Sequence, residues 1–83
     1  MYIVYILKSE VTGILYKGYT SNLSHRIEEH NNNLSEYTAN KGPWKLVYSE
    51  CYTEKKEALI REKSLKKANS KYLKWLIDNY SLL

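Results

Sequence analysis

With 83 residues, the chain has the length of one small domain, and we expect a single domain over residues 1–83. Its only cysteine, Cys51, excludes an intramolecular disulfide and a zinc site built from several thiolates, and we interpret it as a small core residue. The net charge of +4 is uneven, because residues 55–74 carry eight basic and two acidic side chains, and such a basic segment favours a polyanionic partner.

Two strands are predicted at the start of the chain. Residues 2–7 are mostly β-branched or aromatic, which is typical of a strand. Gly13 closes a turn over residues 10–13, because glycine tolerates a positive φ angle, and residues 14–19 are predicted to form the second strand. The chain is therefore expected to begin with a β-hairpin.

The rest of the chain is predicted to contain three helices and one more strand. Ser21 or Asn22 can cap a helix that runs to about residue 31, and a polar loop over residues 34–43 leads to a strand over residues 44–52. Thr53 is the predicted cap of a helix from residue 54 to about residue 67, and Asn69 or Ser70 that of a helix over residues 71–80. The order β-β-α-β-α-α predicts an α+β fold, in which a three-stranded, at least partly antiparallel sheet packs with about three helices.

The first predicted helix carries two polar side chains on its apolar stripe. The positions i, i+3, i+4 and i+7 are filled by Leu23, Arg26, Ile27 and His30. Arg26 and His30 therefore lie at the edge of the core, where a guanidinium and an imidazole can both meet one phosphate. The alternative is that Arg26 only extends along the apolar surface to reach water. His25 lies off the stripe and is expected in solvent.

A single carboxylate lies on the apolar stripe of the second predicted helix. The stripe consists of Ala58, Leu59, Glu62 and Leu65. An inward carboxylate needs a metal ion, hydrogen-bond donors or an arginine as its partner. Glu62 is therefore interpreted either as a functional residue or as half of a structural ion pair with Arg26 or Arg61.

Taken together, these residues resemble the GIY-YIG nuclease superfamily. The GIY triplet corresponds to residues 3–5 (Ile-Val-Tyr), and the YIG triplet corresponds to residues 16–18 (Tyr-Lys-Gly). The arginine, histidine and glutamate of the family match Arg26, His30 and Glu62, in the same order and at similar spacing. The resemblance covers about residues 2–77, and the chain looks like the small standalone bacterial members, which are similar to the N-terminal nuclease domain of UvrC.

Three features depart from the family pattern. Ile3 replaces the glycine of GIY, and Lys17 replaces the usual apolar residue in the middle of YIG. Lys17 is expected on the opposite sheet face from Tyr16, so this change does not directly affect the catalytic face. Many members also carry an asparagine after the glutamate. Asn69 and Asn79 are candidates for that role, and the sequence assigns it to neither.

The resemblance implies a divalent-metal-dependent endonuclease that hydrolyses phosphodiester bonds in nucleic acid, with DNA favoured over RNA and a role in DNA repair or recombination. One Mg²⁺ or Mn²⁺ would be held by Glu62, since Mg²⁺ takes few protein ligands. The implied catalytic residues are Tyr5, Tyr16, Arg26, His30 and Glu62. The general base is Tyr5, Tyr16 or His30, and the sequence does not rank them. The basic helices would hold the nucleic-acid backbone through Lys63, Lys66, Lys67 and Lys71.

Two other functions fit the same features. A non-catalytic nucleic-acid-binding module of this fold would share the basic surface and would not cleave. An adaptor would dock on a larger complex through an apolar stripe of the third predicted helix, although we favour packing of that stripe on the sheet. The stripe consists of Tyr72, Trp75, Leu76 and Tyr80. The sequence leaves the oligomeric state open.

No membrane-directed segment is predicted. Residues 1–7 are apolar but too short and too uncharged for a signal peptide, and no run approaches the roughly 18 apolar residues that a membrane helix needs. We therefore expect a cytoplasmic protein that does not contact a membrane.

Overall fold

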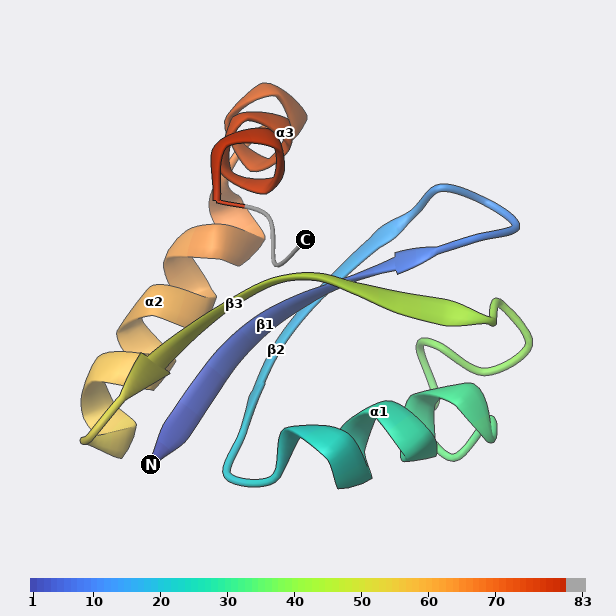
Figure 1. Cartoon of the computed structure of the whole chain (residues 1–83), viewed down its shortest axis with the longest axis horizontal. Helices are drawn as coiled ribbons and strands as arrows, with labels where there is room; N and C mark the ends of the chain where they lie inside the picture. The colour runs from blue at the N-terminus through green and yellow to red at the C-terminus, as the bar shows by residue number, and fades with distance from the viewer. Residues whose placement is uncertain (81–83) are drawn as a thin grey trace.

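The computed structural model describes residues 1–80, and Figure 1 shows a sheet with helices on both of its faces. In these residues the strands are β1 (Tyr2–Ser9), β2 (Leu15–Thr20) and β3 (Trp44–Tyr52). The helices are α1 (Leu23–Asn31), α2 (Lys55–Lys67) and α3 (Ser70–Asn79). The predicted order β-β-α-β-α-α and the α+β fold are confirmed. None of these helices is long and apolar enough to cross a membrane.

β1 is the central strand of the sheet, and both of its pairings are antiparallel. The strand order is β2-β1-β3, and the register places Tyr5 opposite Gly18 on β2 and opposite Ser49 on β3. The turn between β1 and β2 contains Gly13 at φ +77°, a conformation that side-chain-bearing residues adopt rarely. Because elements cover β1 on both faces, residues 4–7 keep 0–1% of their surface exposed.

The alternation of side chains along β1 divides the core into two clusters. Val4 and Ile6 point toward α2 and α3 and pack with Leu65 of α2. Tyr5 and Leu7 belong to the other cluster, against which apolar side chains of α1 are packed. α1 therefore covers one face of the sheet and α2 with α3 the other (Figure 1), and α2 also contacts the edge strand β2.

Asparagine side chains cap two of the helices, as predicted. Asn22 and Asn69 each accept a hydrogen bond from the backbone N–H three residues later, at 3.2 and 2.8 Å. The predicted cap of α2 is wrong, because Glu54 directly precedes that helix and makes no side-chain capping bond. Thr53 lies one residue too early to reach the free N–H groups of the first turn.

The interpretation of Cys51 as a core residue is wrong, since its side chain is exposed. Successive residues of a strand point to opposite faces of the sheet. Tyr48 and Tyr52 of β3 pack with the core cluster beneath α2 and α3. Cys51 is an odd-numbered neighbour on the same strand and therefore points away from that cluster.

The packing face of α3 differs from the predicted stripe. Leu73 and Leu76 are buried against the sheet, with 4% and 3% of their surface exposed. Tyr72, Trp75 and Tyr80 are exposed. One residue turns an α-helix by about 100°, so a stripe displaced by a single position presents a different face. Only Leu76 of the predicted stripe is confirmed as a core contact.

Candidate active site

Three hydrogen-bonded side chains lie on the α1 side of the sheet. The Tyr5 hydroxyl lies 3.0 Å from His30 Nε2, and His30 Nδ1 lies 2.7 Å from Thr38 Oγ1. Tyr5 comes from β1, His30 from the last turn of α1, and Thr38 from the loop that precedes β3. All three are buried, with at most 1% of their surface exposed. The structure therefore brings two of the predicted site residues into direct contact and adds a third residue.

The partners of Thr38 determine the direction of the hydrogen bonds in this chain. The Thr38 hydroxyl donates to the Ser35 carbonyl oxygen at 3.5 Å, so it accepts from His30 Nδ1–H. His30 Nε2 is then an acceptor, and the Tyr5 hydroxyl donates to it. Burial lowers the pKa of His30, and the positive charge of Arg26 lowers it further, so the imidazole is neutral at pH 7.

Tyr5 retains its proton in this environment. Burial raises the pKa of Tyr5 to about 12, and the electrostatic interactions with Tyr16 and Glu62 act in the same direction. Arg26 opposes them, because its guanidinium lies beside the Tyr5 hydroxyl. Because the raised pKa disfavours the phenolate, Tyr5 can donate its proton to His30 only if it accepts a second proton at the same time.

Gly18 makes room for the Tyr5 ring. The two residues are paired across β1 and β2. A Cβ atom on Gly18 would lie 2.7 Å from the Tyr5 hydroxyl oxygen and 2.9 Å from Tyr5 Cζ, which is closer than such atoms pack. The glycine is therefore required by the position of the tyrosine, and it lets the hydroxyl stay within reach of His30.

Arg26 is a cation at the surface beside Tyr5. Its Nη1 lies 3.2 Å from Glu29 Oε1, and 32% of its side-chain surface is exposed. Burial opposes the charge on Arg26, but the interactions with Glu29 and Tyr5 together outweigh burial, so the pKa of the guanidinium is raised. Within residues 1–80, the ion-pair partner of Arg26 is therefore one partly exposed carboxylate. His25 is exposed, as predicted.

Glu62 is the buried carboxylate of α2, with 9% of its surface exposed. Its ion-pair partner within residues 1–80 is Lys66, whose Nζ lies 3.7 Å from Glu62 Oε1 and whose side chain is 52% exposed. The predicted partners Arg26 and Arg61 are wrong, because each of them pairs with a different glutamate. The charge of Glu62 is thus balanced by one loosely held lysine.

The donor set at Glu62 fits a metal ion that takes few protein ligands. In the part of the chain that the structure describes, no three His, Cys, Asp or Glu side chains gather at one point. A zinc site closed by four protein ligands would need such a group. Mg²⁺ is commonly held by one or two carboxylates, water and a substrate phosphate, and Glu62 offers one such carboxylate.

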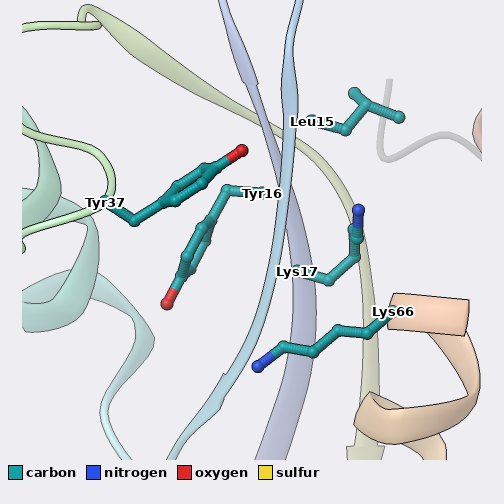
Figure 2. A pocket seen from close by; sticks show the side chains of 5 residues that line it. All are labelled: Leu15, Tyr16, Lys17, Tyr37 and Lys66. Carbon is teal, nitrogen blue, oxygen red and sulfur yellow. The ribbon is translucent and has the colours of Figure 1, made fainter.

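Tyr16 lines an open hollow next to these groups (Figure 2). The hollow has a volume of about 380 Å³, and its lining residues are Leu15, Tyr16, Lys17, Tyr37 and Lys66. The Tyr16 ring centroid lies 4.7 Å from that of His30 and 5.7 Å from that of Tyr37. Lys66 reaches the hollow from α2 while pairing with Glu62. The hollow therefore brings Tyr16 together with the lysine that pairs with Glu62.

The four lysines predicted to bind nucleic acid are exposed but do not line one hollow. Lys66 lies beside Tyr16, as described. Lys67 lines a second hollow between α2 and α3, and Lys71 lines a third on α3. Lys63 is exposed on α2. Of the four, Lys66 is the one that the structure brings to Tyr16 and Glu62.

Neither asparagine candidate joins this group. Asn69 caps α3, and Asn79 Nδ2 donates to the backbone oxygen of Trp75 at 2.8 Å. Thr38 and Tyr37 were not predicted, because both lie in an irregular polar segment where no periodicity indicates the direction of a side chain. Lys17 was expected to leave the site unaffected, yet it lines the hollow, which extends around the edge strand β2.

Comparison with known proteins places the chain in a family. The model of the GIY-YIG catalytic domain matches residues 1–75. A UPF0213 protein of Clostridium perfringens is 44% identical over 80 residues, which cover 95% of this chain and 85% of that protein. A UPF0213 protein of Staphylococcus epidermidis is 45% identical over 64 residues, or 76% of this chain and 77% of that protein.

A solved structure agrees with this assignment. The solution NMR structure of a UPF0213 protein from Bacillus halodurans matches with a TM-score of 0.60 and 31% identity, covering 94% of this chain and 84% of that one. The triplets on β1 and β2 and the residues matched on α1 and α2 lie inside the range of the family model. The chain therefore belongs to the GIY-YIG family, and its relatives include small UPF0213 proteins.

Proposed function

We propose that the chain is a metal-dependent endonuclease that hydrolyses phosphodiester bonds in nucleic acid, with DNA favoured, in DNA repair or recombination. The observation that carries the proposal is the hydrogen bond from Tyr5 to the buried, neutral His30, with Arg26 and Glu62 acting on the same hydroxyl. A proton acceptor, a cation and a carboxylate are the groups that phosphodiester hydrolysis requires.

Glu62 would hold one Mg²⁺ or Mn²⁺ together with water and a phosphate oxygen. When bound, the ion would stabilise the charge on the phosphate and on the leaving oxygen. The Lys66 side chain is 52% exposed, so its ammonium can leave Glu62 without becoming a buried, unpaired cation. Replacing Lys66 by a metal ion at Glu62 should therefore cost little free energy.

In the proposed reaction, the attacking water gives a proton to the Tyr5 oxygen while Tyr5 passes its own proton to His30 Nε2. His30 has no exposed surface, so it acts through Tyr5 and does not contact the water. Tyr5 remains neutral throughout, which suits a hydroxyl with a raised pKa. Thr38 keeps His30 in the tautomer that accepts at Nε2.

Arg26 and Tyr16 would contact the phosphate. Only 1% of the Tyr5 surface is exposed, so water meets its hydroxyl only if a neighbouring side chain moves. Arg26 lies beside that hydroxyl, and a phosphate attracts the guanidinium through two charge-assisted hydrogen bonds. In its new position the guanidinium would neutralise the charge that develops in the transition state. Tyr16, at the rim of the hollow, would donate a hydrogen bond to the same phosphate.

The exposed lysines would hold the sugar-phosphate backbone without reading bases. The residues assigned this role are Lys63, Lys66, Lys67 and Lys71. Because such contacts release counterions, binding should weaken as the salt concentration rises. Affinity that stays constant between low and high salt would contradict this assignment.

The proposal is tested by cleavage of a labelled panel of DNA and RNA structures with Mg²⁺ or Mn²⁺. Glu62→Gln is compared with Glu57→Gln, which changes an exposed glutamate on the same helix. We expect metal-dependent cleavage by the unmodified chain and by Glu57→Gln, and binding without cleavage by Glu62→Gln. If the unmodified chain binds the panel and cleaves none of it, the chain is a binding module and the nuclease proposal is wrong.

A further inference from the structure

The hollow beside Tyr16 is lined by three residues that the proposed hydrolysis does not use, and two of them, Tyr37 and Lys17, can bind a ligand through an aromatic ring or a charge. Its volume of about 380 Å³ lies at the lower end of the roughly 300–1,000 Å³ typical of small-ligand pockets. A space of that size suits one nucleotide. Figure 2 shows that the hollow is bordered by the Tyr16 and Tyr37 rings on one side of β2 and by Lys17 and Lys66 on the other.

The Tyr37 ring is exposed and yet held in position. Its residue is 52% exposed, and Lys41 Nζ lies 4.3 Å from the ring centroid while donating to the Tyr37 backbone oxygen at 2.7 Å. The neighbouring ring of Tyr16 is tilted by 34° to it. A fixed, exposed aromatic ring is a platform on which a nucleobase can stack.

Two lysine side chains line the hollow from different elements. Lys17 lies on β2 and Lys66 on α2, and both side chains line the hollow. Lys17 occupies the middle of the second triplet, where an apolar residue would supply no charge. An aromatic ring and two cations around one small hollow match the two parts of a nucleotide, a base with a π face and an anionic phosphate.

We propose that this hollow binds an unpaired nucleotide next to the scissile phosphate, with its base on Tyr37 and its phosphate near Lys17 and Lys66. The position of the subsite rests on the proposed hydrolysis, because Tyr16 borders both sites and Lys66 links the hollow to Glu62. In a duplex both faces of a base are covered by its neighbours, so a paired base cannot stack on Tyr37. The preferred substrate class is therefore nucleic acid with unpaired nucleotides at the cleavage position.

The test measures binding without metal, in the presence of a chelator, so that it is independent of cleavage. The probe is a DNA duplex with a short single-stranded arm that carries the fluorescent base 2-aminopurine at its first unpaired position, and the reference is the same duplex without the arm. We expect Tyr37→Ala to weaken binding of the armed probe about 10-fold, to abolish the quenching of 2-aminopurine, and to leave binding of the plain duplex unchanged. Tyr37→Phe should bind like the unmodified chain, because stacking needs the ring and not the hydroxyl. Tyr80→Ala, which removes an exposed ring of the α3 surface, is the matched control and should change neither probe.

A second variant, Lys17→Met, tests the phosphate contact. It should weaken binding of the armed probe. It should also reduce the slope of log affinity against log salt concentration by about 1, the value expected for the loss of one phosphate contact. An arm of RNA in place of DNA shows which nucleic acid the subsite prefers. Equal weakening of armed and plain probes by Tyr37→Ala, or no weakening of either, would overturn the subsite while leaving the hydrolysis proposal intact. Quenching that depends on Tyr37 in a chain that never cleaves would support the subsite and refute the nuclease.

Discussion

Two glutamates at the interface of α2 with the sheet, Glu50 and Glu62, differ in how completely their charge is compensated. Glu50 on β3 accepts hydrogen bonds from Arg61 Nε at 3.0 and 3.1 Å and from the hydroxyl groups of Tyr48 and Tyr52. Burial opposes its charge, but these donors outweigh burial and lower the pKa of Glu50. Glu62 is also buried, yet its ion-pair partner in residues 1–80 is a lysine at 3.7 Å.

The difference separates a carboxylate with a structural role from one that is available for a ligand. The donors around Glu50 come from β3 and α2, and Arg61 also lies 3.2 Å from the Tyr72 hydroxyl of α3, so the cluster ties three elements together. Such a carboxylate has no capacity left for a ligand. Glu62 has that capacity, because its lysine partner lies 3.7 Å away and is half exposed. A buried charge with few fixed partners is therefore the better candidate for a binding role.

The largest expected effect comes from Glu62→Gln. We expect cleavage to fall on the order of 10³-fold, and the free energy of unfolding to change by less than about 0.5 kcal/mol, because the ion pair with Lys66 is long and half exposed. Cleavage kinetics and urea unfolding measure the two effects. A loss of stability as large as that of a Glu50 variant would break the distinction between the two carboxylates.

Tyr5→Phe should lower cleavage on the order of 10²-fold, because it removes the hydroxyl that relays the proton to His30. Tyr19→Phe on β2 is the matched control and should cleave normally. Single-turnover rates at saturating metal give the comparison. If Tyr5→Phe cleaves normally while Tyr16→Phe is inactive, Tyr16 and not Tyr5 takes the proton of the water.

Glu50→Gln should have the opposite effect to Glu62→Gln. It leaves Arg61 without its carboxylate, and we expect the free energy of unfolding to fall by about 2–3 kcal/mol. Cleavage should be unchanged at temperatures where the variant is folded. Urea unfolding followed by circular dichroism measures the first effect, and a folded variant that has lost activity would contradict the structural role.

The pH dependence of activity and that of stability should differ, because the first depends on His30 and the second on Glu50. The pKa of His30 lies below its ordinary value of 6.5, mainly because of burial, so activity should persist at pH 6.5 and fall below it as His30 gains a proton and stops accepting from Tyr5. The pKa of Glu50 is lowered from 4.5, so its stabilisation is complete above pH 4.5 and is lost as the pH falls through the lowered value. Rate profiles and unfolding curves across pH 3–8 are the measurement. Activity that falls only together with the fold would contradict the assignment of His30.

The smallest effect is expected from Thr38→Val, which removes the acceptor that fixes the His30 tautomer. Cleavage should fall about 10-fold, and Thr38→Ser should restore it because it keeps the hydroxyl. The decrease in cleavage rate should be accompanied by a shift of the low-pH side of the pH–rate profile. A variant that was merely less stable would not show this shift. An unchanged rate and pH–rate profile in Thr38→Val would show that the tautomer is fixed by other means.

The sequence predicted the elements well because their patterns are local. The alternation in β1 and the capping asparagines Asn22 and Asn69 depend on neighbouring residues alone, and the structure has them as predicted. Thr53 and Cys51 were misinterpreted for a related reason. A shift of one residue changes which side chain caps a helix or which face of a strand is covered, and that depends on the other elements.

The contacts between distant residues could be predicted only in part. Spacing on the helices and the family resemblance indicated His30 and Glu62, but not the partners of either side chain. Thr38 reaches His30 from an irregular segment, and Lys66 reaches Glu62 from the next turn of the same helix. The partner of Glu50 is eleven residues away on another element. The pair of Lys66 with Glu62 has the local i,i+4 spacing. The pairings of Thr38 and of Glu50 depend instead on how the helices and loops are placed on the sheet, which no short-range pattern specifies.

Because Gly18 lies so close to the Tyr5 ring, the residues that positions 5 and 18 tolerate depend on each other. Both the hydroxyl oxygen and Cζ of Tyr5 lie within 3.0 Å of the point where a Cβ of residue 18 would be. A phenylalanine at position 5 would keep Cζ and would not relieve the crowding. In a library with both positions randomised, folded variants with a residue larger than glycine at position 18 should therefore carry a residue without a six-membered ring at position 5. Once one of the two triplets has changed in this way, the other is free to change as well.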